Sequence, residues 1–518
     1  MNGKIGDRDR SVKKARRGAI ARGVLLFLAV ALVVILALAI GLNVGGLRER
    51  LLGGGTPRIE TIAVLPFENL SRDPAQDYFA EGMRQMLVGD VQRIGGWRVI
   101  SGAALSQYRK APKPLPEIAR ELNIDAVVEG SVLRSGDSLQ LTVKLTHAPT
   151  NRRLWAQTYE RDLHDLSNLQ AEVLQAIARE TKVKLTPREE AIFSASRPVN
   201  PQAYEAQIRG MLAGDPAKAE EYFKQAIQLD PAYARPYTFL AARYFMRNMY
   251  PMSPTAAPRD TYPKAKEAAQ KALSLDPNIG MSHRVLGAVA LEYEWDFAEA
   301  EKQFKGEVEI APNGSWSHHM YAHYLLSMGR MEEARAETRR GEEADPKGSG
   351  LIACTGWHEI AEGKYDEAEK RALQALGLGA RDQLARLVLG WSYALRGRHE
   401  EAIAELQKAV VGWQNAVFPT AALGHAYAVA GKMDAAQEVL KGLLERSKKE
   451  YVSPYEIAVI YAGLGDKDRA FEWLEKAYEE RSSQLVYFRA DPRIWSLRSD
   501  PRFQELLRRM NFPQDRQD

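Results

Sequence analysis

With 518 residues, the chain is too long for one ordinary domain and predicts two or three. Its 45% apolar and 27% charged residues are typical of globular proteins, and a net charge of +4 gives no ground for a general affinity for nucleic acids. A single cysteine, Cys354, excludes an internal disulfide and a four-cysteine zinc site.

The N-terminal region predicts a membrane anchor. Residues 23–42 contain no charged or strongly polar side chain, and as a helix they would span about 30 Å, the thickness of the hydrocarbon core of a bilayer. We therefore predict a transmembrane helix over 23–44, preceded by a basic cytoplasmic tail, 1–22, which would direct the following residues across the membrane. The alternative is a cleaved signal peptide, although the apolar run is longer than such peptides need and no clear small-x-small site follows it.

After a glycine-rich linker over 45–57, the pattern changes to that of a mixed α/β domain over 58–190. Apolar runs and breaks predict strands at 59–65, 97–101 and 154–159, and helices at 76–94, 115–122 and 166–185. Residues 125–134 and 138–146 are predicted to form a hairpin around Ser135-Gly136-Asp137. The second strand of the hairpin alternates between apolar and polar residues, so only one of its faces should be buried.

Four segments of this domain resemble the TolB-like domain that precedes tetratricopeptide repeats in many bacterial sensory proteins. They are Ile62-Ala63-Val64-Leu65-Pro66-Phe67-Glu68-Asn69-Leu70-Ser71, Tyr78-Phe79-Ala80-Glu81-Gly82, Val127-Val128-Glu129-Gly130-Ser131-Val132 and Leu154-Trp155-Ala156. The resemblance implies a bacterial protein, and together with the predicted transmembrane helix and its flanking charges we expect a single span in the inner membrane with most of the chain in the periplasm. In that family the module usually follows a cytoplasmic winged-helix, kinase or nucleotide cyclase effector. Since residues 1–22 are too few to fold, we expect any effector to be a separate protein.

The second half of the sequence repeats every 34 residues. Alanines keep this step from Ala300 to Ala470, and small residues keep it at Ala322, Gly356, Gly390 and Gly424. A period of this size predicts a solenoid of stacked helix pairs, because neither helix of a unit can bury its apolar face alone. Gly390 and Ala402 are predicted to lie where two helices cross, since a larger side chain would hold the backbones apart.

The pattern of small residue, aromatic residue, alanine and proline resembles the tetratricopeptide repeat (TPR) family over 201–481. Counting backwards to Ala265 and Ala219 gives about eight helix pairs, with an insertion interpreted at Met249–Tyr262. Residues 482–518 are predicted to cap the last repeat with the apolar side chains of Phe503, Leu506, Leu507 and Met510. The fold class is thus mainly α with one small α/β domain.

One register position suggests a binding surface. His323, Trp357, Trp391 and His425 follow the small crossing residue in four successive units, and His319 and Leu387 lie one helical turn earlier on the same face. The resemblance to TPR proteins implies that this face lines a concave groove, where aromatic side chains would anchor a protein or peptide partner. The alternative is that these rings pack as ordinary core.

No constellation of residues predicts catalysis, a cofactor or a metal site. Glu68, Glu81 and Glu129 have no feature that pairs them as acid and base, and Cys354 and His358 lie one helical turn apart within repeat sequence. Among His318, His319 and His323, the last two share a helical face, but no third ligand is apparent.

We therefore predict a non-catalytic, membrane-anchored scaffold or sensor that binds protein or peptide partners and no nucleic acid. The alternative is the sensory half of a signalling or transcription system with a separately encoded effector.

Overall fold

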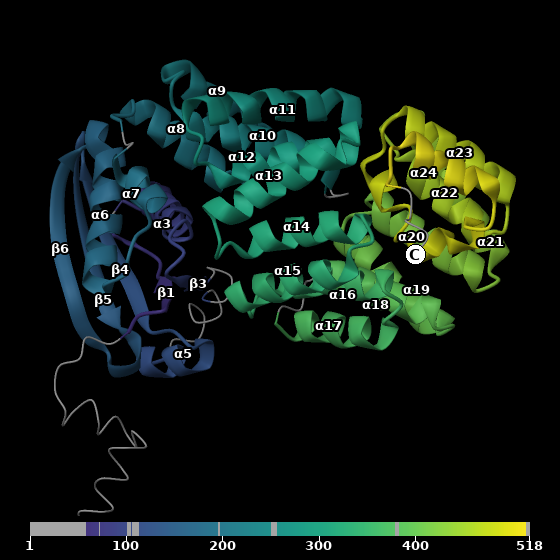
Figure 1. Cartoon of the computed structure of the whole chain (residues 1–518), viewed down its shortest axis with the longest axis horizontal. Coiled ribbons are helices and arrows are strands. Elements are labelled where there is room, and N and C mark those ends of the chain that lie inside the picture. The colour runs from purple at the N-terminus through teal and green to yellow at the C-terminus, as the bar shows by residue number, and fades with distance from the viewer. Residues whose placement is uncertain are drawn as a thin grey trace, which may run out of the picture. The chain divides into compact units, whose positions relative to one another are not determined.

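The computed structural model describes residues 58–71, 73–100, 105, 113–194, 197–249, 256–378 and 383–513. These residues form a small sheet with its helices, followed by a long array of helix pairs (Figure 1). The predicted tail, transmembrane helix and linker all lie outside the described residues. Within them, no helix is both long enough and apolar enough to cross a membrane.

The sheet has the strand order β3-β1-β4-β5-β6, with β2 paired to β4. Its strands are β1 (Thr61–Val64), β2 (Glu68–Asn69), β3 (Arg98–Ile100), β4 (Ala126–Ser135), β5 (Ser138–His147) and β6 (Arg152–Asp162). β1 is parallel to β3 and β4, with Ile62 opposite Val99 and Ala126. β4, β5 and β6 form an antiparallel meander, so the predicted hairpin is confirmed.

Helices cover both faces of the parallel part of the sheet. α3 (Asp77–Val91) and α6 (Leu166–Thr181) pack on the face of Ile62, Val64 and Val99, whereas α5 (Leu115–Leu122) packs on the face of Ala63 and Val127. This division follows from the alternation of side chains along a strand. On β5, Leu139, Leu141, Val143 and Leu145 are buried as predicted, while Lys144 is exposed.

Two of the predicted elements differ clearly in length from the observed ones, and two observed elements were not predicted. The strand expected at 154–159 is longer, since β6 pairs with β5 along its whole length. The helix expected at 166–185 ends at Thr181, because Lys182 adopts a left-handed conformation with φ of +59°. The sequence analysis did not predict the two-residue β2 or α7 (Pro187–Ser194).

The described residues beyond α7 form eight antiparallel helix pairs, as the register predicts. The pairs are α8 (Pro201–Leu212) with α9 (Pro216–Leu229), α10 (Ala234–Met249) with α11 (Pro258–Leu275), α12 (Gly280–Val289) and its π-helical turn η5 (Ala290–Glu294) with α13 (Phe297–Ile310), α14 (Ser315–Ser327) with α15 (Met331–Ala344), α16 (Ser349–Ala361) with α17 (Tyr365–Leu378), α18 (Gln383–Leu395) with α19 (His399–Gly412), α20 (Val417–Val429) with α21 (Met433–Arg446), and α22 (Pro454–Gly463) with α23 (Lys467–Glu479). The interpretation of Met249–Tyr262 as an insertion is wrong at its end, because α11 begins at Pro258 and includes Pro263 in its first turns.

Two sets of glycines explain why the units repeat so regularly. A Cβ atom on Gly390 would lie 2.5 Å from Cγ of Leu406 and 3.3 Å from the carbonyl oxygen of Ala402, which confirms the predicted helix crossing. A second set lies in the turns within the pairs and has φ between +74° and +78°, a conformation that favours glycine. These turn glycines are also 34 residues apart: Gly329, Gly363, Gly397, Gly431 and Gly465.

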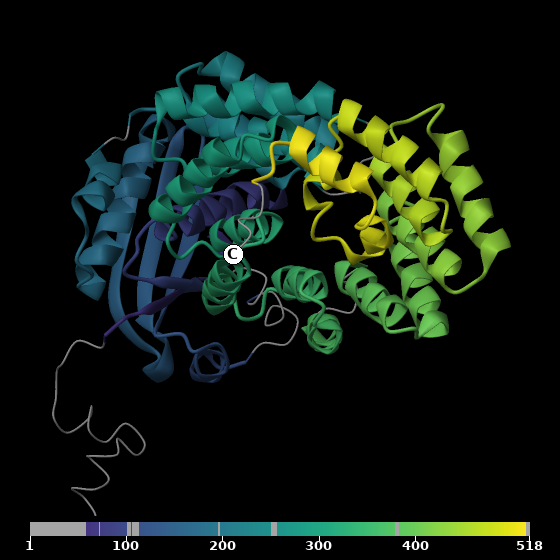
Figure 2. The same ribbon diagram turned by 45° about the vertical axis from the view of Figure 1, so that its right-hand side comes forward.

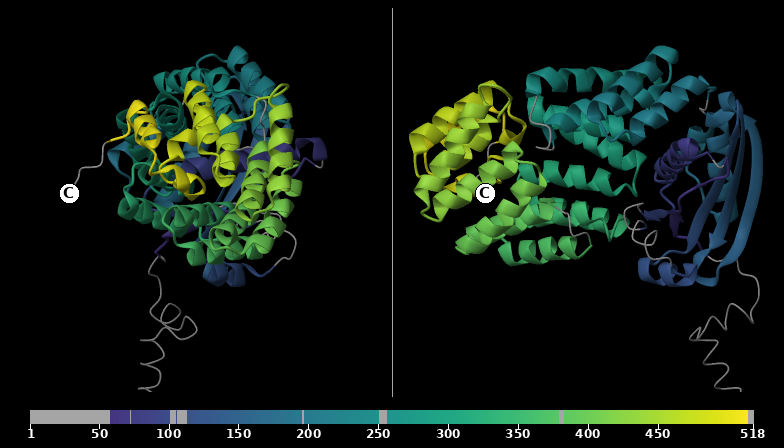
Figure 3. Two further views of the ribbon diagram at one scale, coloured as in Figure 1. Left: turned by 90° about the vertical axis from the view of Figure 1, so that its right-hand side faces the viewer. Right: turned by 180° about the vertical axis from the view of Figure 1, so that it is seen from behind.

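The C-terminal segment does more than cover the last repeat. It consists of η6 (Ser483–Tyr487), η7 (Pro492–Leu497) and α24 (Pro501–Arg509), and Figure 2 shows it in yellow beside the last helix pairs. α24 contacts α23 through Arg509 and Glu475, and its predicted apolar face is buried at Phe503, Leu506 and Met510. η6 and η7 instead contact η5 and α22, and the views in Figure 3 show these yellow elements beside the neighbouring green helices.

Candidate functional site

The first helices of the repeats and the C-terminal segment enclose a cavity of about 180 Å³. We call it the central cavity. Its wall is mostly apolar and includes residues of α14, α16 and α18 on one side and of η6 and η7 on the other. The predicted groove residues that line it are His323, Trp357, Leu387 and Trp391.

The groove is therefore not open in the way the sequence analysis expected, because the chain's own C-terminal segment lies against it. The ring of Tyr487 meets that of Trp357 edge to face at 5.0 Å between centroids. The guanidinium of Arg493 lies 4.5 Å above the centroid of Trp391, in a cation–π contact. Four of the six predicted residues thus gather around one cavity, with part of their surface covered by residues 483–497.

The other two predicted residues, His319 and His425, are buried and do not line the central cavity, although each contacts a residue that does. His425 Nε2 lies 3.2 Å from the backbone oxygen of Arg493, and burial lowers the pKa of His425 to about 4. His319 packs beside His358, with ring centroids 5.4 Å apart. For these two side chains, the alternative interpretation as core describes their surroundings better than the groove does.

A cluster of buried charges fixes the C-terminal segment in place. Arg493 donates to Asp491 at 2.7 and 3.0 Å and to Glu456 of α22 at 3.4 Å. Tyr455 donates to the same carboxylate of Asp491 at 2.8 Å. Burial works against the charge on Asp491, but Arg493 outweighs it and holds the pKa of this carboxyl below its usual value. The sequence analysis missed this cluster because its members come from two distant segments.

Two glutamates near the central cavity have raised pKa values. Burial raises the pKa of Glu456 to about 7 although Arg493 opposes the shift. Burial likewise raises the pKa of Glu292, on η5, to about 7, while the hydroxyl of Tyr262 donates to it at 2.5 Å. Neither glutamate is a sequence-predicted site residue, and Glu292 lies in a π-helical turn that repeat periodicity does not predict.

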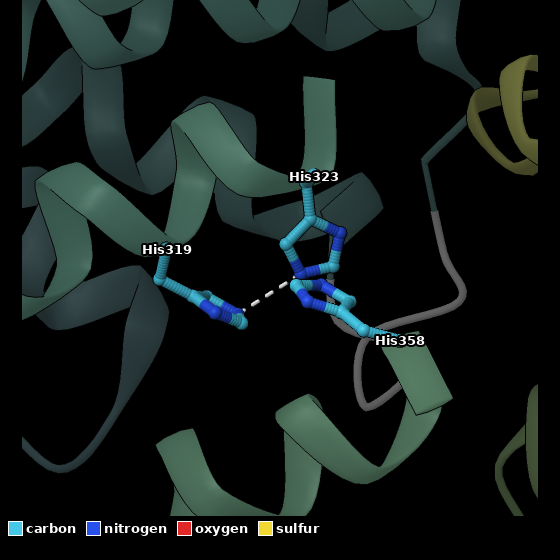
Figure 4. Close-up of side chains that lie close together, drawn as sticks. All are labelled: His319, His323 and His358. Carbon is cyan, nitrogen blue, oxygen red and sulfur yellow. Dashed lines mark hydrogen bonds between the residues drawn. The ribbon is translucent and has the colours of Figure 1, made fainter. Parts of the chain in front are cut away.

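Three imidazoles meet beside the central cavity, two from α14 and one from α16 (Figure 4). His323 Nε2 lies 2.9 Å from His319 Nε2, and one nitrogen from each of these rings lies within 4.8 Å of one from His358. Burial holds the pKa values of His319 and His323 well below their usual value and lowers that of His358 to about 4, so all three rings are neutral at pH 7. The third ligand that the sequence analysis lacked is thus supplied by the next helix pair.

The remaining candidates from the sequence are dispersed. His318 faces α15, where its Nδ1 lies 2.6 Å from Glu337. The thiol of Cys354 lies 3.4 Å from Nε2 of His323 on α14, an imidazole that the sequence analysis did not pair with it. Glu81 pairs with Arg84, and Glu129 accepts from Thr146 at 3.1 Å.

Comparisons with known proteins agree with the two resemblances. Residues 52–153 match the TolB amino-terminal domain, and residues 211–233, 355–416 and 421–484 match tetratricopeptide repeats. A Rhizobium meliloti (strain 1021) protein, provisionally named adenylate cyclase 3, is 30% identical over 254 residues, which are 47% of this chain and 42% of the relative. The chain thus matches less than half the length of this relative.

Several solved structures are similar in fold. One is YrrB, described as a TPR protein with an unusual peptide-binding site, with 21% identity, 37% of this chain and 93% of that chain covered, and a TM-score of 0.26. Another is yeast Tom70, with 13% identity, coverage of 66% and 83%, and a TM-score of 0.39. On the matches to the family models, the chain contains a TolB amino-terminal domain followed by tetratricopeptide repeats.

Proposed function

We propose that this chain is a non-catalytic binding protein, anchored in the bacterial inner membrane, that takes a short apolar segment of a protein or peptide partner into the central cavity. The observation that carries the proposal is the cavity wall, which Trp357, Leu387 and Trp391 line, the two tryptophans being 34 residues apart at the same position of successive units. Aromatic anchors of this kind supply most of the binding energy at protein interfaces.

The contacts of the C-terminal segment support a peptide as the occupant. An aromatic ring and a guanidinium of this segment, those of Tyr487 and Arg493, already bind the two tryptophans. The inner face therefore has the chemistry to hold an extended segment through stacking and cation–π contacts. A partner would occupy the part of the central cavity that the chain's own C-terminal segment does not fill.

The test is crosslinking in intact cells followed by mass spectrometry, with wild type compared to the double variant Trp357→Ala plus Trp391→Ala. We expect a partner that wild type captures and the double variant loses by at least about tenfold, as the removal of two anchors predicts. Trp473→Ala is the matched control, because this tryptophan lies on α23 with Lys476 above its ring and outside the cavity.

Trp357→Ala alone keeps the test usable if the double variant unfolds, since Trp357 is partly exposed. Equal capture of the same neighbours by wild type and by a folded Trp357→Ala variant would contradict the proposal.

Alkaline phosphatase fused after residue 60 tests on which side of the membrane the chain lies, and we expect the fusion to be active.

A second candidate function is favoured by the relative whose name is that of a nucleotide cyclase. In this proposal the chain is the sensory part of a signalling system and acts on an effector through residues 1–44. Deletion of residues 1–22 with insertion preserved should then abolish signalling, whereas a scaffold would keep capturing its partner.

A further inference from the structure

His319, His323 and His358 form a compact group of three imidazoles on two neighbouring helix pairs. His319 and His323 are four residues apart on α14, so both rings leave the same face of the helix. His358 comes from α16, and Figure 4 shows its ring beside the other two. One nitrogen from each ring lies within 4.8 Å of the others.

These rings contain buried nitrogens that no group in the described part of the chain satisfies. They are His319 Nδ1, His323 Nδ1 and His358 Nε2, and the side chains are 1%, 9% and 4% exposed. A buried polar atom without a partner costs about 1–3 kcal/mol. The contact between His319 and His323 at 2.9 Å uses only one nitrogen of each ring.

A neighbouring hydroxyl sets the orientation of the third ring. Oγ1 of Thr338, on α15, lies 3.2 Å from His358 Nδ1. When Nδ1 donates to this oxygen, Nε2 carries a lone pair and is free to ligate. Outer partners of this kind fix the tautomer of histidines that bind metals.

We propose that His319, His323 and His358 bind a zinc ion, with the thiolate of Cys354 as the fourth ligand. The thiol sulfur lies 3.4 Å from His323 Nε2 but outside the 4.8 Å group of the three imidazole nitrogens, so the Cys354 side chain has to turn toward the ion to ligate it. Zinc prefers a tetrahedral set of imidazole and thiolate donors, with metal–nitrogen distances of about 2.0–2.1 Å. Binding converts the thiol to a thiolate and releases its proton to solvent.

The position of the site gives the ion both a route of entry and a structural effect. His323 and Cys354 line the central cavity, through which the ion can reach the three rings. Coordination would join α14 to α16 and thereby fix the spacing between two consecutive helix pairs. The site does not depend on the proposed partner, so either proposal can fail without the other.

The test uses the full chain, purified without a histidine tag and treated with a chelator. Cobalt(II) is the spectroscopic probe, since it takes the place of zinc in tetrahedral sites. We expect uptake of about one equivalent with visible absorption bands, a sulfur-to-cobalt band that Cys354→Ser removes, and displacement of cobalt by zinc.

His358→Gln should weaken binding by more than the 10–100-fold that the loss of an outer partner causes. His358→Cys restores a ligand at the same position and should restore binding with a stronger sulfur-to-cobalt band. His399→Gln, at the start of α19 and outside the cluster, is the matched control and should bind as wild type does.

Uptake of less than about half an equivalent by wild type at micromolar metal would overturn the proposal. So would unchanged affinity in a His358→Gln variant whose circular dichroism shows it to be folded. An unchanged cobalt spectrum in Cys354→Ser would overturn the assignment of the fourth ligand.

Discussion

The buried face of the sheet and the inner face of the solenoid are built on opposite principles. The apolar side chains that β5 buries are Leu139, Leu141, Val143 and Leu145, and none is more than 3% exposed. Around the central cavity, Arg493, Glu292 and Glu456 are also buried, yet they are ionisable. An apolar core gains stability from every side chain, whereas buried charges depend on their partners for it. The inner face therefore gives up stability that the sheet retains, as binding sites commonly do.

The largest expected effect is that of Arg493→Met. This change removes the guanidinium but leaves Asp491 and Glu456 buried, which should lower the free energy of unfolding by about 3–5 kcal/mol. Chemical denaturation followed by circular dichroism measures it.

A triple variant separates lost charge from lost packing. Arg493→Met combined with Asp491→Asn and Glu456→Gln removes the whole charge cluster and should regain most of the lost stability. On the sheet, Leu145→Ala should cost about 2–5 kcal/mol, and the cost comes from the cavity that it leaves. If the triple variant were no more stable than Arg493→Met alone, buried charge would not be what distinguishes the two regions.

The second effect concerns pH. The pKa of Glu292 is raised from 4.5 to about 7 in the folded protein, so its contribution to stability is fully present below pH 4.5 and is lost as pH rises through 7. Glu292→Gln does not titrate and should become more stable than wild type by on the order of 3 kcal/mol at pH 8. Unfolding curves of both proteins at pH 5 and pH 8 measure the difference.

The buried histidines contribute to the pH dependence of the free energy of unfolding with the sign opposite to that of Glu292. Because they are present in both the variant and the wild type, their contribution cancels when the two proteins are compared at the same pH. Glu438→Gln is the control, because this glutamate is exposed on α21, and its curves should run parallel to those of wild type. A Glu292→Gln curve parallel to wild type as well would show that this carboxyl titrates normally.

The smallest expected effect concerns the turn glycine between the two helices of each repeat. Gly431→Ala should cost about 1–2 kcal/mol, because Gly431 has a φ of +74°. Gly442→Ala, within α21, should instead add about 0.5–1 kcal/mol. A Cβ atom would meet nothing within 4 Å at either position, so the pair isolates the backbone term. Equal melting temperatures for the two variants would contradict it.

The sequence predicts those parts of the fold that depend on local patterns. The 34-residue register identifies six of the helix pairs, and counting back to Ala265 and Ala219 adds the first two. The alternation in β5 identifies the face that carries its buried apolar residues, because this pattern too is local in the sequence. Gly390 is predicted at a helix crossing for the same reason. Register also gathers Trp357, Leu387 and Trp391 at one cavity.

The parts that it misses depend on contacts between distant segments. Nothing near Arg493 indicates that its guanidinium is buried against Trp391, since the two residues meet only when the C-terminal segment folds back. His358 lies 35 residues after His323, which is one residue more than the 34-residue period. A search for metal ligands on a single helix does not find it. That offset by one residue is the signal that would have indicated the cluster.

The C-terminal segment also affects the order in which the chain can be completed. The hydroxyl of Ser483 lies 3.4 Å from the backbone oxygen of Asn248, which is 235 residues away, and the ring of Phe512 packs at a tilt against that of Phe297, with their centroids 4.8 Å apart. Repeat arrays with contacts only between neighbours can fold unit by unit as they leave the ribosome. Here the second and third helix pairs gain their last contacts only after the ribosome has made almost the entire chain. A nascent chain released before Tyr487 would lack the hydroxyl that hydrogen-bonds to the buried Glu292, and this makes premature termination more harmful than the loss of one terminal helix.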